Sequence, residues 1–338
     1  LPTLSLRHLL FENMTPEWRY KLLSEELLKL RGRHFEIMLE GVDDFQATLD
    51  RVLFEACNTS FQLHLQIDPR EFVAMHNWAQ LLSGPVMSIT ANSPILFGKE
   101  LWAENRIALF KQSLDTRGEQ NHSREIVPRV YFGKKWLENS PIELWRENVA
   151  RFPQLLRGYG DMDPMDAIKA GITPKLKSVG LHNGSTYNWY RLCYGVANNS
   201  PHIRFECRYI TSGPTRLDEV ANFAFWVGLM KGMPEEMKDF WKHTDFRVAK
   251  SNFLKAARTG IQTVLYWDGK NYRAKDLLHE VMIPMSRRGL EKMNVNIGDI
   301  DRLLCVIEQR AITENTGAQW QKTNFRNLMK KYKPSVVT

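Results

Sequence analysis

The chain has 338 residues, of which 43% are hydrophobic and 25% are charged. These proportions are typical of folded globular proteins and exclude a mainly disordered chain. The formal net charge is +8, but the basic residues are spread through segments that are also rich in Glu and Asp. This distribution favours small anionic substrates, such as nucleotide phosphates, over nucleic acid as the partner.

Simple patterns argue against three kinds of protein. No run of about 18 apolar residues occurs, so we expect no membrane span. The first residues are interrupted by Arg7, His8 and Glu12 and do not form a secretory signal peptide. The four cysteines lie far apart without a C-x-x-C pair, which argues against a structural zinc site or a disulfide framework. We therefore expect a reducing, cytoplasmic location.

The first part of the chain predicts a helix, a strand, a second helix, a second strand and a third helix. The first helix has a capping signature at Thr15-Pro16-Glu17 and ends at Gly32. The strands are predicted from alternating apolar residues and the other two helices from helical spacing. The remaining predicted elements are a strand at 34–40, a helix at 43–58, a strand at 61–67 and a helix at 69–82.

The second part of the chain is predicted to be mostly helical. Asp268-Gly269 indicates a hairpin between 261–267 and Tyr272. Because helices outnumber strands without regular alternation, we expect an α+β fold with an antiparallel sheet. The predicted elements are helices at 140–156, 214–230, 246–258, 274–293 and 297–311, a surface loop at 158–173 and a strand at 203–210.

Two of the predicted strands place unusual side chains on one face. Gln62, His64 and Gln66 share a face of the first, with apolar residues on the other face. In the second strand, the same rule groups Arg204, Glu206 and Arg208. Helices packed on the apolar face, with the polar face left open, explain both patterns.

The polar faces have two interpretations that the pattern alone leaves open. They are either solvent-exposed surface or the floor of a functional site. A neutral His together with a Glu can bind a divalent metal, and arginines hold phosphate in bidentate fashion. The residue types therefore favour a metal and phosphate site over an ordinary wet surface.

Over nearly its whole length the chain resembles the bacterial glutamate–cysteine ligase type 2 family, also called carboxylate–amine ligases. It looks most like the variant in which CBS domains follow this body. The segments that carry the resemblance are LRHLLFENMTPEWRY near the start, LFEACNTSFQLH at 53–64, GP at 84–85, ANSP at 91–94, ENRIALF at 104–110, DTR at 115–117, LHNG at 181–184, RFECR at 204–208, SGPT at 212–215 and DEVAN at 218–222.

The resemblance implies a glutamine-synthetase-like fold, one polar open face on an antiparallel sheet, and the cofactors ATP and Mg²⁺. The implied reaction phosphorylates the γ-carboxyl of glutamate and lets an amine, typically that of cysteine, attack the acyl phosphate. This places the protein in glutathione biosynthesis, with small-molecule substrates as its partners. Phosphate makes the carboxyl oxygen a good leaving group, so catalysis consists of positioning and charge neutralisation.

The resemblance also implies roles for particular residues. His64 and Glu206 match the metal ligands, and Arg208 matches the arginine that contacts phosphate. Arg106 resembles the arginine that holds the substrate α-carboxylate, and Arg191 occupies the position of another active-site arginine. For each arginine, a structural salt bridge is the alternative.

Asn252 and Arg258 resemble residues at the nucleotide end of the site, and here too a structural role is the alternative. Tyr190, next to Arg191, departs from the Asn that the family pattern leads us to expect there. Cys207 falls on the apolar face by alternation, so we do not assign it as a nucleophile.

The family has a preceding segment with a G-x-E-x-E strand whose acids complete the metal cluster. The chain begins at Leu1, after that point, so we expect residues 1–338 to be a single ligase-type domain that lacks this strand. One Glu and one His do not satisfy the octahedral oxygen coordination of Mg²⁺. Glu36 and Glu40 fall where the family has an ordinary hairpin strand, and we reject them as substitutes.

Three functions stay open at this point. The first is an ATP-dependent ligase joining glutamate to cysteine, and the second is a ligase of the same fold that uses another amine. The third is a non-catalytic binding or regulatory homologue. Neither nucleic acid nor a membrane is expected as a partner, and assembly into a homo-oligomer is left open.

Overall fold

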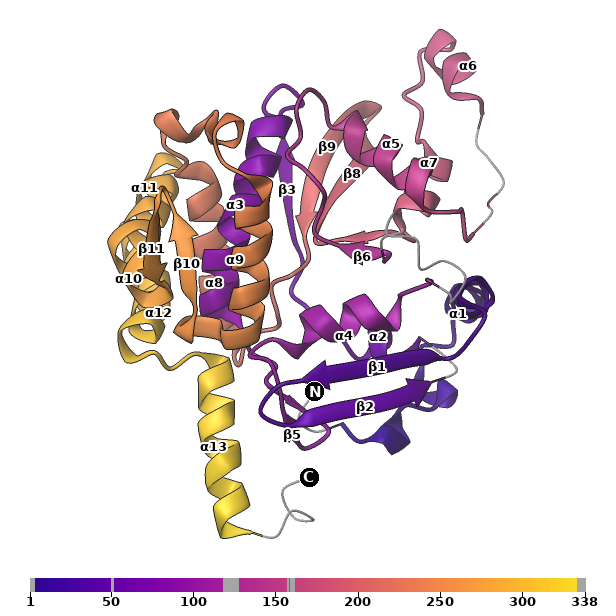
Figure 1. Ribbon diagram of the computed structural model, residues 1–338. Helices are drawn as coiled ribbons and strands as arrows, with labels where there is room; N and C mark the ends of the chain where they lie inside the picture. The colour runs from indigo at the N-terminus through magenta and orange to yellow at the C-terminus, as the bar shows by residue number, and fades with distance from the viewer. Residues whose placement is uncertain (1–3, 50–51, 118–127, 157, 159–161, 333–338) are drawn as a thin grey trace.

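The computed structural model describes residues 4–49, 52–117, 128–156, 158 and 162–332 (Figure 1). The helices are α1 (Trp18–Arg31), α2 (Leu53–Ala56), α3 (Phe72–Thr90), α4 (Asn105–Ser113), α5 (Ile142–Arg151), α6 (Pro164–Lys169), α7 (Lys177–Asn183), α8 (Arg216–Lys231), α9 (Phe246–Thr259), α10 (Ala274–Leu277), α11 (Ile283–Lys292), α12 (Ile297–Thr313) and α13 (Gly317–Lys331). The strands are β1 (Phe35–Glu40), β2 (Asp44–Leu49), β3 (Leu63–Ile67), β4 (Ile95–Leu96), β5 (Lys99–Glu100), β6 (Val130–Tyr131), β7 (Tyr187–Asn188), β8 (Tyr190–Ala197), β9 (Ser200–Cys207), β10 (Val264–Trp267) and β11 (Lys270–Arg273).

Helix α3 lies at the centre of the molecule and is buried along nearly its whole length. Its sequence is mostly apolar and even its polar residues are buried, which is typical of a helix surrounded by protein. It packs against α8 and α9, which run beside it (Figure 1). The buried side chain of Trp78 donates its indole N–H to the carbonyl of Leu229 at 3.0 Å. The helix thus provides a rigid support for the main sheet.

The main sheet is antiparallel and has the strand order β3-β9-β8. Strands β8 and β9 form a hairpin whose turn contains Asn198 and Asn199, both with positive φ. Asn tolerates this left-handed conformation, and its presence at both turn positions matches the right-handed twist of the strands. Strand β3 comes from far earlier in the chain and pairs with the other edge of β9.

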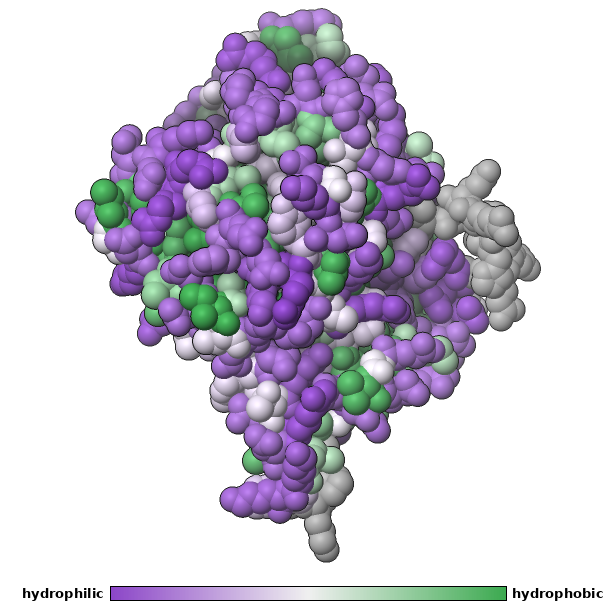
Figure 2. Space-filling view, turned by 60° about the vertical axis from the view of Figure 1, so that its left-hand side comes forward, coloured by the Kyte–Doolittle hydropathy of each residue, from purple (hydrophilic) through white to green (hydrophobic). Residues whose placement is uncertain are grey.

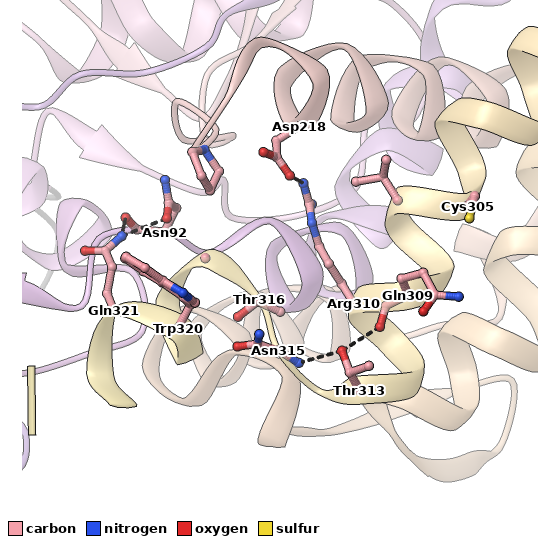
Figure 3. A pocket seen from close by; sticks show the side chains of 13 residues that line it. Asn92, Asp218, Cys305, Gln309, Arg310, Thr313, Asn315, Thr316, Trp320 and Gln321 are labelled. Carbon is pink, nitrogen blue, oxygen red and sulfur yellow. Dashed lines mark hydrogen bonds and ion pairs between the residues drawn. The ribbon is translucent and has the colours of Figure 1, made fainter. Parts of the chain in front are cut away.

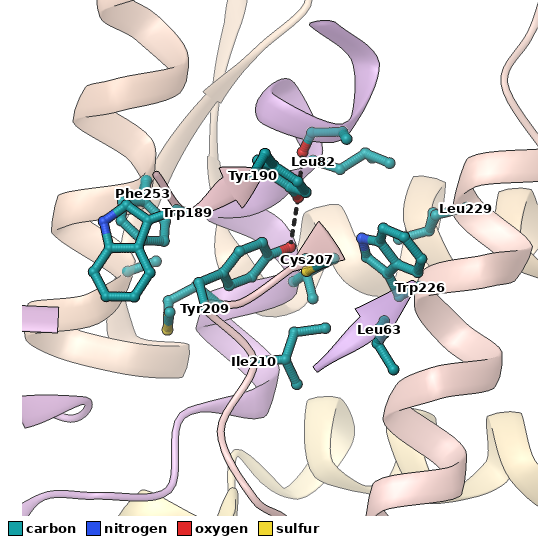
Figure 4. Packing of buried hydrophobic residues seen from close by; sticks show 14 of the residues in the cluster. Leu63, Leu82, Trp189, Tyr190, Cys207, Tyr209, Ile210, Trp226, Leu229 and Phe253 are labelled. Carbon is teal, nitrogen blue, oxygen red and sulfur yellow. Dashed lines mark hydrogen bonds between the residues drawn. The ribbon is translucent and has the colours of Figure 1, made fainter. Parts of the chain in front are cut away.

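One face of this sheet forms the hydrophobic core (Figure 4). Phe205 of β9 is fully buried and packs edge-on against Phe72 of α3 and Trp226 of α8. Tyr190 donates its hydroxyl hydrogen bond to the Ala79 carbonyl at 2.6 Å. Cys207 is completely buried on this face, as its place in the alternation predicts. The opposite face of the sheet is therefore left for the polar side chains.

The remaining strands form small pairs outside the main sheet. The β1-β2, β4-β5 and β10-β11 pairs are antiparallel, and β6-β7 is parallel. Figure 2 shows a largely hydrophilic surface over one side of the molecule, with hydrophobic residues in small groups. Among the described residues, no helix has the length and apolar character needed to cross a membrane.

The predicted mixture of helices with an antiparallel sheet is confirmed. The strands predicted at 61–67 and 203–210 are found as β3 and β9, but β9 begins at Ser200 and ends at Cys207, so residues 208–210 lie beyond it. The predicted helix at 43–58 is wrong over residues 44–49 and is found only as the short α2 at Leu53–Ala56. Residues 44–49 form β2, which pairs with β1 so that Phe45 lies opposite Leu39. The spacing of Phe45 and Leu49 fits both a helix and a strand. In the folded chain this segment is a strand because it pairs with β1.

Two further differences concern helices. The loop expected at 158–173 contains α6, whose N-terminus is capped by Asp163 with Pro164 at the first position; residues 159–161 of that prediction lie outside the described part of the chain. The predicted helix at 274–293 is one continuous helical path whose middle is a π-helical segment, Leu278–Met282. Helix α13, which Figure 1 shows projecting from the body, was not predicted.

Helices α8 and α11 approach each other closely at glycines. A methyl group added at Gly289 would overlap the backbone of Gly228 and Gly232. We expect Gly289→Ala to lower the free energy of unfolding by about 2–3 kcal/mol, because backbone must move to admit the methyl group. Denaturant unfolding measures the change. The control is Gly180→Ala in α7, where the added methyl meets nothing within 4 Å and stability should be unchanged or higher. Equal effects of the two substitutions would contradict the close approach of α8 and α11.

Candidate functional site

The polar face of the β3-β9-β8 sheet brings together side chains from three separate segments. In the strand register, His64 of β3 and Arg191 of β8 are both direct neighbours of Glu206 on β9. Side chains at paired positions lie on the same side of the sheet and about 5 Å apart at Cβ. The register therefore groups three of the predicted site residues, and we call their shared surface the open face.

Glu206 is the centre of this open face. Its carboxylate is fully buried and accepts two hydrogen bonds from Arg191 at one oxygen, from Nε at 3.0 Å and from Nη2 at 2.6 Å. Arg208 places its Nε 3.1 Å from the other oxygen. A buried carboxylate needs such compensation, because charge is costly to remove from water. Glu206 thus fixes the directions of two arginine side chains.

The arginines also determine the protonation state of Glu206. Burial by itself raises the pKa of this carboxyl, but the charges of Arg191 and Arg208 outweigh burial and hold the pKa below its ordinary value. Since the pKa is lower in the folded state, the carboxylate stabilises the fold above the ordinary carboxyl pKa. That stabilisation is lost as the pH falls through the lowered value.

His64 lies on the exposed side of Glu206. Its Nδ1 accepts a hydrogen bond from Nε of Arg204 at 3.3 Å. Burial lowers the pKa of His64, and although Glu206 acts to raise it, the neighbouring arginines lower it further. At neutral pH the imidazole is therefore neutral and keeps a lone pair for a hydrogen bond or a ligand.

Arg208 has a buried hydrogen-bond donor to spare beside Glu206. Only 12% of its side chain is exposed, and its guanidinium lies over the rings of Phe110 and Tyr187. Its Nη1 is buried and makes no hydrogen bond. Buried donors without a partner are rare in proteins, so this N–H is available to an anionic oxygen that approaches the open face.

Two residues at the open face were not predicted. The thiol of Cys193 lies 3.5 Å from a carboxylate oxygen of Glu206, and burial raises its pKa. Glu55 of α2 is half-buried; burial raises its pKa and the charge of Arg208 acts to lower it. The alternation along β8 could have identified Cys193, whereas the approach of α2 to the sheet has no sequence signal.

Arg106 does not lie with these residues. It is 3% exposed, with Nε 3.1 Å from Glu104 and Nη2 donating to the Tyr209 carbonyl at 2.5 Å. These contacts tie the start of α4 to the segment that follows β9. Its predicted contact with a substrate carboxylate stays a prediction.

Asn252 and Arg258 also lie apart from the open face. Asn252 is buried in α9 and exchanges two hydrogen bonds with the backbone of Tyr266, at 2.7 and 3.0 Å, which hold β10 against the helix. Arg258 is exposed and places its guanidinium 4.9 Å from the centre of the Trp102 ring. Their nucleotide-binding roles likewise stay predictions.

The described residues offer an incomplete set of metal ligands. Ligand atoms of His64, Cys193 and Glu206 all lie within 4.8 Å of one another. Mg²⁺ prefers an octahedron of oxygen atoms, whereas this group supplies one nitrogen, one sulfur and a carboxylate already bound by two arginines. These residues alone do not fit a Mg²⁺ site, and further acidic ligands would be required.

Glu36 and Glu40 do not supply those acids in this structure. Both lie on β1, which pairs with β2 in a sheet separate from the one that carries His64 and Glu206. Phe35, Ile37 and Leu39 face the core from this strand, so the two glutamates point outward. This placement agrees with their rejection as metal ligands on sequence grounds.

A further hollow, of about 830 Å³, lies between α8, α12 and α13 and contains none of the predicted site residues (Figure 3). Arg310 crosses its wall and pairs with Asp218 at 2.6 Å and with the amide oxygen of Asn222 at 2.7 Å. Asp218 also accepts from Thr215, which caps α8. The first turn of α8 is thus engaged in capping and packing, where acids also suit the helix dipole.

We expect Glu206→Gln to destabilise the fold, because it leaves two buried arginines without a counter-charge. The free energy of unfolding at pH 7 should fall by about 3 kcal/mol. The deficit should shrink in acid, where the wild-type carboxylate is also protonated. Denaturant unfolding as a function of pH tests this, with exposed Glu291→Gln as the control. A deficit that stays constant from neutral to acid pH would contradict the ion-pair account.

A model of glutamate-cysteine ligase family 2 (GCS2) matches residues 7–323 of the chain. No curated protein gives a significant match. The matched range includes β3, β8 and β9 with every residue of the open face. The chain therefore belongs to glutamate-cysteine ligase family 2.

Proposed function

We propose that this protein is an ATP-dependent carboxylate–amine ligase with a glutamine-synthetase-like catalytic fold. In the proposed reaction, ATP phosphorylates the γ-carboxyl of glutamate and the amine of cysteine attacks the acyl phosphate. The observation that carries the proposal is the cluster of arginines around Glu206 on the open face, in a chain that belongs to this family.

The chemistry explains why arginines are needed. A carboxylate resists attack by an amine until one of its oxygens becomes a leaving group, and phosphoryl transfer supplies that group. Negative charge spreads over the phosphoryl oxygens during the transfer, and fixed cations stabilise it. The free Nη1 of Arg208 is the donor that we assign to a phosphate oxygen, and Arg191 adds a second positive charge beside it.

Glu206 has a positioning role in this scheme. It holds the guanidinium groups of Arg191 and Arg208 in place before the substrate arrives. Preorganised charges cost no rearrangement at the moment of reaction. We also propose Glu206 and His64 as part of the Mg²⁺ site; the metal, when bound with its remaining ligands, would neutralise further phosphate charge.

The contacts of Arg106 favour a structural role over the substrate-binding role that the resemblance implies. Its guanidinium is engaged by Glu104 and Tyr209 in the interior, so its contacts favour the structural alternative. Arg191, in contrast, is 20% exposed at the open face and retains access to a substrate. We therefore propose Arg191 and Arg208 as catalytic arginines, and for Arg106 a structural role in place of substrate binding.

Two other functions are compatible with the same face. A ligase of this fold could use an amine other than cysteine, because no contact among the described residues selects the acceptor. A non-catalytic homologue would keep the fold and bind without turnover. Release of ADP, measured with glutamate, ATP and Mg²⁺ across cysteine and other amines, separates the three. Glutamate-dependent ADP release with cysteine is the result we expect from the full-length gene product, and no turnover with any amine would contradict the ligase proposal.

We expect Arg208→Met to lower kcat by about 100-fold or more, because it removes a preorganised donor to the transferring phosphate. The test is steady-state ADP release at saturating substrates. Exposed Arg288→Met, which removes the same charge elsewhere, serves as the matched control and should stay within about twofold of wild type. An equal effect of both substitutions would rule out a specific role for Arg208.

We expect His64→Ala and Glu206→Ala each to abolish Mg²⁺-dependent ATP binding in the full-length protein. Titration calorimetry with ATP, in the presence and absence of Mg²⁺, measures this. Thermal unfolding of each variant, done beside the titration, identifies a loss of binding that follows from loss of fold. Unchanged nucleotide affinity in both folded variants would contradict the assignment of His64 and Glu206 as metal ligands.

A further inference from the structure

A second cavity, of about 810 Å³, lies between α4 and α9 and is bordered by β1 and the segment that contains β6. Its volume is in the range of small-molecule sites. None of His64, Arg191, Cys193, Glu206 or Arg208 lines it. One lining residue, Arg258, is among those for which the family resemblance implies a nucleotide role; the other basic residues of the lining have no role in the open-face chemistry.

The lining of this cavity is strongly basic, with seven Lys or Arg residues and two acids, Glu40 and Asp115. Two of the basic residues have local partners: Arg117 pairs with Asp115, and Arg247 with Asp245. The other five make no ion pair with a carboxylate in the described part of the chain, and these are Lys111, Lys134, Lys250, Lys255 and Arg258.

The unpaired cations repel one another within the cavity. Desolvation lowers the pKa of Lys111, and the charges of Arg117 and Lys250 lower it further. Arg258 is held in place by its stacking on Trp102. A concave surface with converging cations raises the local concentration of anions, and a bound anion would relieve the repulsion between Lys111 and Lys250.

Aromatic side chains separate this cavity from the open face. Trp189 lines the cavity, and its ring packs against that of Phe110 at 5.6 Å. Phe110 also packs on Tyr187 at 5.4 Å, and the guanidinium of Arg208 lies over both of these rings. An anion bound between α4 and α9 is therefore on the other side of these rings from the carboxylate of Glu206.

We propose that the cavity between α4 and α9 binds an oligophosphate, an anion of two or more linked phosphate groups, through Lys111, Lys250 and Arg258. Several linked charges match several converging cations better than a single phosphate does. A concave hollow of this volume suits one compact ligand, whereas nucleic acid would need an extended basic track. The site lies apart from the open face, and its ligand is either the phosphate tail of a nucleotide or a free oligophosphate.

The test is titration calorimetry of the full-length protein with inorganic tripolyphosphate, without Mg²⁺ and at two salt concentrations. We expect binding that weakens as salt rises, because exposed charges are screened. The double variant Lys111→Ala/Lys250→Ala should lose about tenfold or more in affinity. The control Lys270→Ala/Lys292→Ala removes two exposed lysines that do not line the cavity and should change affinity by less than about threefold. Equal losses in the two double variants would overturn the proposal.

Two further arms identify the source of the anion and separate this site from the open face. If ATP affinity falls in the Lys111/Lys250 variant together with that of tripolyphosphate, the cavity takes the nucleotide's phosphates; if only tripolyphosphate affinity falls, it takes a free oligophosphate. The second arm separates this cavity from the open face, because Arg208→Met should leave tripolyphosphate binding in place.

Loss of tripolyphosphate binding in Arg208→Met, with full binding in the Lys111/Lys250 variant, would assign the anion to the open face and overturn the proposal. Duplex DNA that displaces tripolyphosphate at equal phosphate concentration would also overturn it.

Discussion

The buried carboxylate of Glu206 is the interaction on which the open face depends. It lies on the central strand of the main sheet, has a neighbour on each side, and holds Arg191 and Arg208 by ion pairs at 2.6 and 3.1 Å. A buried acid with no partner would be expensive, and two buried arginines with no acid would be equally so. The three side chains are therefore stable only as a group, and this group presents positive charge to whatever approaches the sheet.

The strand alternation divides β9 between two functions. Phe205 and Cys207 face α3 and α8 and belong to the core, whereas Arg204 and Glu206 face the open side, as does Arg208 directly after the strand. A shift of register by one residue would exchange the two sets and bury the arginines. The packing of Phe205 between Phe72 and Trp226 therefore fixes the site as firmly as the ion pairs do. The arginine geometry that we propose for phosphate binding rests on this core.

Much of this could be predicted from the residues along the chain, and the failures have physical causes. The period of two in 61–67 and 203–210 identified both strands and the correct face for His64 and Glu206. Pairing of β3 with β9 followed only from the fold, since nothing local encodes a partner so far away in the chain. The same limit explains why Cys193 and Glu55 were not predicted as part of the site. Cys193 becomes a neighbour of Glu206 only through the β8-β9 hairpin, and Glu55 comes near Arg208 only through the position of α2. Phe45 and Leu49 were assigned to a helix because their spacing fits both periods, and the contact with β1 decided between them.

The central claim is that the open face supports formation of an acyl phosphate from glutamate and ATP. Positional isotope exchange tests this step without any amine. ATP labelled with oxygen-18 at the β,γ-bridge is incubated with the full-length protein, glutamate and Mg²⁺, and the position of the label is read by phosphorus NMR. The account predicts glutamate-dependent movement of the label from the bridge to a non-bridging position, and loss of that movement in Arg208→Met. Label that stays in the bridge with glutamate present, under conditions where ATP binds, would contradict the account.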